Sequence, residues 1–156
     1  RRTPTLRARN GLRQRWRIVN AARSRYFQLR LPGHSFSRIG GDTGLLAAPE
    51  ELEQLLIVPG ERVDVVVRPM GGEGERIPLT WVPYDRGYGS VEFRDAEPVL
   101  WLETRGSVVA DEPLPALGGG ADPLDVSGAT PVQIRLTQGK DRAGALQFGI
   151  DGVPFE

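Results

Sequence analysis

The sequence predicts an all-β fold, a β-sandwich of short strands joined by tight turns. Apolar and polar residues alternate over several short runs, which is the period of half-buried strands. The 156-residue chain holds 20 glycines and 13 prolines, which supply turns between these runs. No run of the sequence shows a sustained helical period. We therefore expect strands with few helices.

The stretch Leu55–Val67, which reads LLIVPGERVDVVV, is the clearest strand signal in the chain. Two apolar runs flank Pro59-Gly60. In the second run, Val63, Val65 and Val67 share one side of a strand, against Arg62, Asp64 and Arg68 on the other. Because Pro presets φ and Gly permits most backbone angles, the chain can either reverse here or step between two sheets.

Four strands are expected before this stretch. They are Thr5 to Arg9, Leu12 to Asn20, Arg25 to Leu31, and His34 to Ile39. Asn10-Gly11, between the first two strands, is a strong hairpin signal. Gly40 to Gly44 is expected to be a turn, and Pro49 to Glu53 an acidic connector.

The second of these strands should turn one side to the core. Leu12, Gln14, Trp16 and Ile18 share that side, and Arg13, Arg15 and Arg17 share the other. If Trp16 is a full core residue, Trp16→Ala should destabilise the chain by about 3–5 kcal/mol. A much smaller loss would place Trp16 at the surface.

After the central stretch, the pattern predicts strands over Arg76 to Pro83 and Val99 to Glu103, with a loop from Tyr84 to Arg94 between them. Residues 105–130 are rich in Pro and Gly and read as an interdomain linker. Two further strands are predicted around Val132, Ile134 and Leu136, and around Leu146, Phe148 and Ile150. The expected organisation is a domain over 1–104, a linker over 105–130, and the first hairpin of a following domain over 131–156.

Composition excludes several kinds of chemistry. The chain has no cysteine, one histidine and one methionine, so it builds no disulfide, zinc–thiolate site or thiol nucleophile. No apolar run approaches the length of a membrane span, and no membrane partner is expected. The chain opens with Arg1-Arg2-Thr3 and shows no signal peptide, which suggests a fragment of a longer protein.

Each residue that could carry chemistry has a simpler structural interpretation. His34 follows Gly33 and is expected to bond backbone groups in a turn rather than a metal. Glu50, Glu51 and Glu53 lack a histidine or nucleophile partner and read as a solvated connector. Ser24, Ser35 and Ser37 lack a base, and the glycines at 40, 41 and 44 precede no helix that could cradle a phosphate. We therefore expect no catalytic, cofactor-binding or metal-binding residue.

The arginine-rich front of the chain raises a nucleic-acid hypothesis. No acidic residue precedes Asp42, and Arg13, Arg15 and Arg17 would share one strand face. The net charge of the whole chain is nevertheless zero, and strand-face arginines commonly pair with carboxylates across interfaces. No nucleic-acid partner is expected, although salt-dependent binding of an oligonucleotide would revive the hypothesis.

Several motifs resemble the middle domain of three-domain multicopper oxidases of the bacterial, laccase-like kind. LLIVPGERVDVVV is similar to their PGERxDVxV signature, and RWRIVNAARSRYFQLRLPGHSFSRIGGDTG, Arg15 to Gly44, to their RxRxxNA…GHxFxxIGxDGG run. VPYDRG, Val82 to Gly87, and the tail LQFGIDGVPFE, Leu146 to Glu156, also resemble family segments. Thr43 and Asp151 depart from the usual glycine and asparagine, and both positions still suit a turn.

This resemblance implies a cupredoxin-like Greek-key β-sandwich. It implies no copper in this chain, with copper held by flanking cupredoxin domains of the parent protein, the longer protein to which the chain would belong. The implied reaction of that parent is one-electron oxidation of phenolic or metal-ion substrates coupled to reduction of dioxygen to water, at a periplasmic or secreted location. A copper-free relative, such as the cell-division proteins of this superfamily, is the alternative.

The apolar tail raises a question of its own. Two strands alone are marginally stable in water. We therefore expect residues 131–156 to dock either on an edge strand of their own sandwich or on a neighbouring copy. The second route would make the chain a homo-oligomer through its C-terminal tail.

Overall fold

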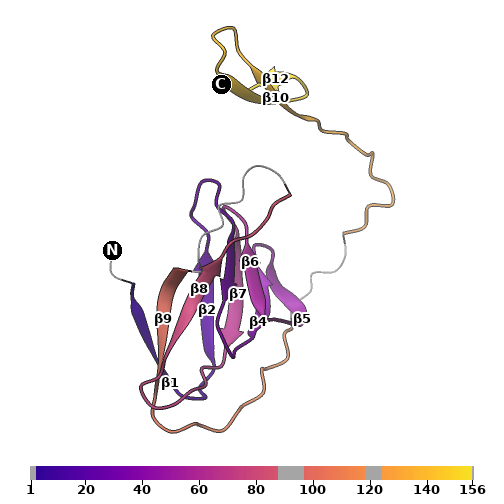
Figure 1. The fold of residues 1–156 in the computed structure, drawn as a ribbon. Helices are drawn as coiled ribbons and strands as arrows, with labels where there is room; N and C mark the ends of the chain where they lie inside the picture. The colour runs from indigo at the N-terminus through magenta and orange to yellow at the C-terminus, as the bar shows by residue number, and fades with distance from the viewer. Residues whose placement is uncertain (1–2, 88–96, 119–123, 156) are drawn as a thin grey trace. The chain divides into compact units, whose positions relative to one another are not determined.

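The computed structural model describes residues 3–87, 97–118 and 124–155, and its regular structure there is entirely β (Figure 1). The chain forms two separate compact units, Arg1–Ala121 and Asp122–Glu156. The first unit holds two facing sheets, and the second holds a small sheet of its own. The all-β prediction is confirmed.

The first sheet has five strands in the order β1-β9-β8-β3-β6. Their bounds are β1 Thr5–Arg9, β3 Phe27–Arg30, β6 Gln54–Ile57, β8 Arg76–Val82 and β9 Glu97–Arg105. β1 runs parallel to β9, and the remaining pairs are antiparallel. Consecutive strands are mostly not neighbours, so the chain crosses repeatedly to the other sheet.

The second sheet has four strands in the order β2-β7-β4-β5, all antiparallel. Their bounds are β2 Gln14–Val19, β4 Phe36–Gly41, β5 Gly44–Leu52 and β7 Arg62–Val67. Pro59-Gly60 therefore steps the chain from β6 in one sheet to β7 in the other, with Gly60 at φ 83°. The crossovers give the Greek-key wiring of a sandwich.

The core lies between the two sheets and follows the alternation read from the sequence. β7 contributes Val63, Val65 and Val67, and β8 contributes Ile77, Leu79 and Trp81, all of them buried. Phe36 of β4 is fully buried at their centre. Trp16 and Ile18 of β2 are only half-buried and pack against this cluster from the side. The predicted face of β2 is thus right, but Leu12 is 50% exposed.

The predicted hairpin at Asn10-Gly11 is wrong. β1 and β2 belong to different sheets, because β1 pairs with β9 and β2 pairs with β7. The Asn10 N–H donates to the Arg105 carbonyl and the Gly11 N–H to the Pro69 carbonyl, at 2.8 and 2.6 Å. The turn itself forms, since the Leu12 N–H donates to the Arg9 carbonyl at 3.2 Å, but the strands on either side of it pair elsewhere.

The acidic connector predicted over Pro49 to Glu53 is also wrong, because most of it belongs to strand β5. Glu50 lies opposite Arg38, and Glu51 lies opposite Ser37. β5 forms the outer edge of its sheet, where exposed carboxylates hinder pairing with another chain. A run of acidic residues reads as a loop in sequence but fits an edge strand here.

The second unit is a three-stranded antiparallel sheet of β10 Leu136–Lys140, β11 Leu146–Ile150 and β12 Val153–Pro154. The strand predicted around Val132 and Ile134 is displaced, since β10 begins only at Leu136. A turn bonded between Asp141 and Ala145 joins β10 to β11 and sets this register. Asp151, at φ 51°, forms the next turn.

Candidate functional site

Asn20 connects the two main sequence motifs, because it lies in the Arg15–Gly44 run and bonds to the Leu55–Val67 run. Its side-chain amide donates to the carbonyls of Arg25 and Ile57 at 2.8 and 2.9 Å, and its side-chain oxygen accepts from the Ala22 N–H at 3.0 Å. Its backbone also bonds Gly60 and Glu61 in the PGER segment. Asn20 is 2% exposed, so every polar group it offers is satisfied inside the sandwich. Its role is to hold the step between sheets.

Asp64 accepts from the arginine face of β2. Arg15 Nε donates to Asp64 Oδ1 at 2.8 Å, and its Nη2 donates to Oδ2. Arg17 Nε lies 3.9 Å from the same carboxylate. The hydrogen bonds from Arg15 hold the pKa of Asp64 below its ordinary value, against an opposing effect of burial. The arginines of β2 do share a face, as predicted, and this face contains a carboxylate from β7.

Asp42 and Glu61 are used in the same way. Asp42 accepts from the Arg62 backbone N–H at 3.0 Å and pairs with the Arg62 side chain at 2.9 Å. Glu61 accepts from the Val58 N–H at 2.8 Å and lies 3.6 Å from Arg38. The polar residues of the PGERxD segment therefore brace turns and strands, and none is left to act on a substrate.

His34 is held by backbone on both sides of its ring. Nδ1 lies 2.8 Å from the Pro32 carbonyl, and the Met70 N–H donates to Nε2 at 2.9 Å. This arrangement requires the proton on Nδ1, and it occupies both ring nitrogens. The prediction of a backbone-bonded turn histidine is confirmed. His34 therefore does not fit a copper ligand.

The other candidates from the sequence do not gather into a site. Ser35 Oγ donates to Glu51 Oε2 at 3.1 Å in an exposed pair. Among the described residues, no three His, Cys, Asp or Glu side chains are grouped to hold a metal ion. The part of the chain that the structure describes therefore offers no grouped donor set for the copper that the resemblance implies for the parent protein. Within the described ranges no helix is long and apolar enough to span a membrane.

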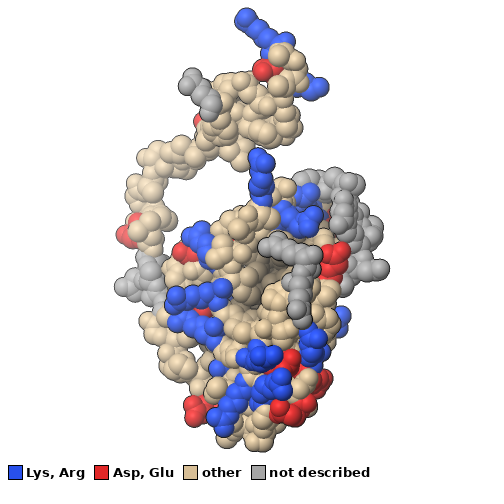
Figure 2. All heavy atoms as spheres, turned by 90° about the vertical axis from the view of Figure 1, so that its left-hand side faces the viewer, with Lys and Arg blue, Asp and Glu red and all other residues tan. Residues whose placement is uncertain are grey.

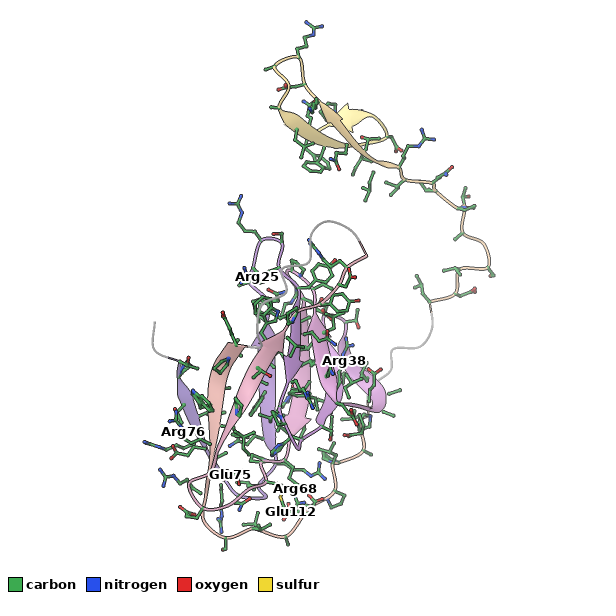
Figure 3. All side chains as sticks on the ribbon, in the orientation of Figure 1. Arg25, Arg38, Arg68, Glu75, Arg76 and Glu112 are labelled. Carbon is green, nitrogen blue, oxygen red and sulfur yellow. The ribbon has the colours of Figure 1, made fainter. Side chains whose placement is uncertain are left out.

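An aromatic and arginine cluster surrounds the VPYDRG segment. Tyr26 and Tyr84 stack with ring centroids 6.1 Å apart, and the Arg86 guanidinium lies 5.5 Å from the Tyr26 ring. Arg25, labelled in Figure 3, lies 5.0 Å from the Trp81 ring. These contacts pack residues 82–87 against the start of β3. The loop predicted over Tyr84 to Arg94 lies partly outside the described residues, and residues 84–87 carry no strand.

Residues 108–115, which we call the strap, pack on the outer face of the four-stranded sheet. The Val109 N–H donates to the Asn10 carbonyl at 3.0 Å. Arg13 donates to both oxygens of Asp111, at 2.9 and 3.0 Å, and Arg68 lies 3.2 Å from the same carboxylate. Arg13 holds the pKa of Asp111 below its ordinary value. Figure 3 labels Arg68 on the sheet and Glu112 on the strap.

The strap begins inside the predicted linker, and its attachment to the four-stranded sheet was not predicted. A Cβ on Gly11 would lie 2.8 Å from the Val109 carbonyl oxygen, so a glycine is needed where the strap crosses. Beneath the strap is a pocket of about 540 Å³ lined in part by Val66 and Arg15. Gly11, which belongs to the expected hairpin signal, is the residue that this close contact with Val109 requires.

An apolar cleft of about 500 Å³ opens between the two sheets. Its lining includes Trp16, Ile18 and Val19 from β2, and Leu6, Val99 and Leu100 from β1 and β9. Figure 2 views the β1 side of the molecule, where basic and acidic side chains lie around a surface of uncharged residues. The cleft has few polar groups for binding or catalysis, so its chemistry suits an apolar contact.

Comparison with known proteins agrees with these features. The sequence pattern of the multicopper oxidase family matches residues 1–75. The cell division protein FtsP of Xenorhabdus nematophila is 48% identical over 54 residues, and the laccase of Bacillus subtilis is 38% identical over 66 residues. These matches span 34% and 42% of this chain but only 11% and 13% of the relatives' lengths.

Solved structures give the same result over more of the chain. The McoA multicopper oxidase of Aquifex aeolicus superposes with a TM-score of 0.76 at 26% identity, covering 96% of this chain and 32% of its own. The multicopper oxidase of Campylobacter jejuni gives a TM-score of 0.62 at 25% identity, covering 79% of this chain and 25% of its own. The sequence match over residues 1–75 and the superposed sheets show a cupredoxin-like fold similar to the domains of multicopper oxidases.

Proposed function

We propose that this chain is the copper-free middle domain of a laccase-like multicopper oxidase, followed by a linker and the first strands of the next domain. The parent protein would oxidise phenolic or metal-ion substrates one electron at a time and reduce dioxygen to water. The chain itself would act as a scaffold between copper-bearing domains. A periplasmic or secreted location belongs to the same proposal.

The observation that carries this proposal is the use of the motif side chains. Asn20, Asp64 and Glu61 are all bonded within the sandwich, and His34 is bonded to backbone through both nitrogens. The likeness to McoA supports the proposal, because it extends over 96% of this chain and about a third of that protein. This is the share expected of one domain in three.

A second candidate is the middle domain of a copper-free division protein. FtsP of Xenorhabdus nematophila is 48% identical over its matched residues, against 38% for the laccase of Bacillus subtilis. The contacts of Asn20, Asp64 and Glu61 are internal to the sandwich. Those contacts serve either kind of parent equally well.

Copper content and oxygen uptake of the full-length parent protein separate these candidates. A laccase-like parent should bind several copper ions and consume dioxygen with a phenolic substrate, whereas a division protein should do neither. The isolated 156-residue chain should bind no stoichiometric copper and show no blue absorbance, because it lacks cysteine and has one histidine. One tightly bound copper ion per isolated chain would contradict the scaffold role.

A further inference from the structure

Two of the three tyrosines in the chain lie side by side because β3 pairs with β8. In this antiparallel pair, Gln28 of β3 lies opposite Val82 of β8. The same register, continued two residues beyond the start of β3 and the end of β8, brings Tyr26 opposite Tyr84. Their rings stack with a centroid distance of 6.1 Å and an interplanar angle of 8°. Directly opposite residues are the closest side-chain neighbours across a strand pair, so the fold itself sets this contact.

The tyrosine pair is the accessible part of a larger aromatic group. Tyr84 is 37% exposed and Tyr26 is half-buried, whereas the neighbouring Trp81 is only 8% exposed. Phenol and indole rings both lose one electron readily, so an oxidant in solution meets the tyrosine pair before this indole. The chain has no cysteine thiol that would compete for the oxidant.

Contacts of Arg86 keep the two rings together. Its guanidinium lies 5.5 Å from the Tyr26 ring, and its Nη1 donates to the Ser24 carbonyl at 3.3 Å. The segment that carries Tyr84 is therefore tied to the segment that carries Tyr26. A radical formed on either ring has a second phenol held beside it, at the high effective concentration of an intramolecular reaction.

We infer that Tyr26 and Tyr84 form an oxidative cross-linking site, at which phenoxyl radicals cause the two rings to join through a carbon–carbon bond. Each tyrosine gives one electron and one proton to a phenoxyl radical, which becomes a phenol. The two tyrosyl radicals couple between ring carbons ortho to their hydroxyl groups, and the hydrogen on each of these carbons moves to the phenol oxygen of its ring. The pair thus loses two electrons and two protons, and two phenoxyl radicals are reduced to two phenols.

The source of these radicals rests on the proposed function, since a parent protein that oxidises phenols one electron at a time releases phenoxyl radicals. The cross-link would consume two of them and tie residues 83–87, which carry no strand, to the start of β3. The coupling itself depends only on the geometry of the pair. It can therefore be tested on the folded chain with radicals from another source.

Phenoxyl radicals made by a peroxidase from a simple phenol and hydrogen peroxide supply this test on the full 156-residue chain. Trypsin should then release a product in which residues 26–30 are joined to residues 77–86 with the loss of two hydrogen atoms, which mass spectrometry identifies. The cross-linked fraction should not fall when the chain is diluted, because both rings belong to one molecule.

Tyr26→Phe and Tyr84→Phe should each abolish this product, whereas the matched control Tyr88→Phe should retain it. Tyr88 lies outside the described residues, and its tryptic peptide, residues 87–94, is distinguished by mass. Urea that unfolds the chain should reduce the product, because the register that pairs the rings is lost.

Absence of the product in the folded chain would overturn the inference, as would an equal yield in urea or a cross-linked fraction that falls on dilution. A product that joins residues 26–30 to residues 87–94 instead would overturn it too. None of these results would affect the proposed function, which copper and oxygen measurements decide.

Discussion

Phe36 and Trp16 are the largest aromatic side chains that the four-stranded sheet directs toward the core, and their burial differs. Phe36 is 0% exposed, whereas Trp16 is half-buried beside the open cleft and bonds Gln14 through its indole N–H at 3.0 Å. Phe36→Ala should destabilise the chain by about 3–5 kcal/mol. Trp16→Ala should cost less, about 1.5–3 kcal/mol, because part of its surface already faces water.

Urea midpoints of the two variants measure this difference. Equal losses would show that Trp16 is covered in solution by something beyond the described residues of the first unit. From the sequence, we expect Trp16→Ala to lower stability by more than the structure implies, because the alternation of β2 predicts a fully buried Trp16. Trp16 is instead half-buried, because it lies on the open side of the sandwich.

Asn20 is expected to stabilise the fold through hydrogen bonds rather than through volume. Asn20→Ala would leave the Ile57 carbonyl and its neighbours without partners in a buried place, at a cost of about 1–3 kcal/mol. Asn20→Asp is the matched control, since it keeps an acceptor for Ala22 but loses both donors. Chemical denaturation should show both variants destabilised. If Asn20→Asp left the free energy of unfolding unchanged, the bonds that Asn20 donates would contribute nothing to stability.

At the scale of elements, the β2–β7 pair should show a characteristic pH dependence. The folded pKa of Asp64 lies below its unfolded value, which is about 3.9 in model peptides. Such a group stabilises the folded state above the unfolded pKa, and this contribution is lost as pH falls through the folded pKa. Asp64→Asn should therefore lower the urea midpoint at pH 7, and its difference from wild type should shrink below about pH 4.

The control for this experiment is Asp85→Asn, which removes a carboxylate whose recorded bond is local, to the Gly87 N–H. Its effect should not follow the pH trend of Asp64. A gap between Asp64→Asn and wild type that persists undiminished at pH 2 would show that the variant acts through packing and not through charge.

The ion pairs of Asp111 should fix the position of the strap while contributing little to the free energy of unfolding. Asp111 is exposed, and surface ion pairs contribute little to global stability. Asp111→Asn should therefore leave the urea midpoint almost unchanged but increase protease cleavage within residues 106–118. Glu112→Gln, one residue further on, is the matched control and should cleave as wild type does. Equal cleavage rates for all three proteins would indicate that Arg13 and Arg68 do not retain the strap.

At the scale of the whole molecule, the second unit has more apolar surface than its small sheet can cover. Val132, Leu136 and Val153 are 80%, 80% and 70% exposed. We still expect this unit to dock on an edge strand of its own sandwich or on a neighbouring copy. Deleting residues 131–156 should then lower the stability of the chain or reduce its solution mass by more than the deleted segment. Light scattering and urea denaturation measure these quantities, and an unchanged monomer of unchanged stability would refute docking.

The sequence alone predicted the fold class and the inward faces, because a period of two fixes which side of a strand is apolar without reference to its neighbours. The valines of β7 and the alternating residues of β8 show this directly. It also indicated that His34 bonds backbone, since a turn histidine without acidic or basic partners has few other roles.

Only the tertiary structure decided which strands are neighbours and what the motif residues do. A period of two says nothing about pairing partners, and the bonds that decide these roles join distant residues. Arg15 and Asp64 are 49 positions apart, and Arg13 and Asp111 are 98 apart. For the same reason Asn10-Gly11 looked like a hairpin and Glu50 like part of a loop. The acceptors of Asn10 and Gly11 lie far along the chain, and Glu50 is placed in a strand only through the pairing of β5 with β4.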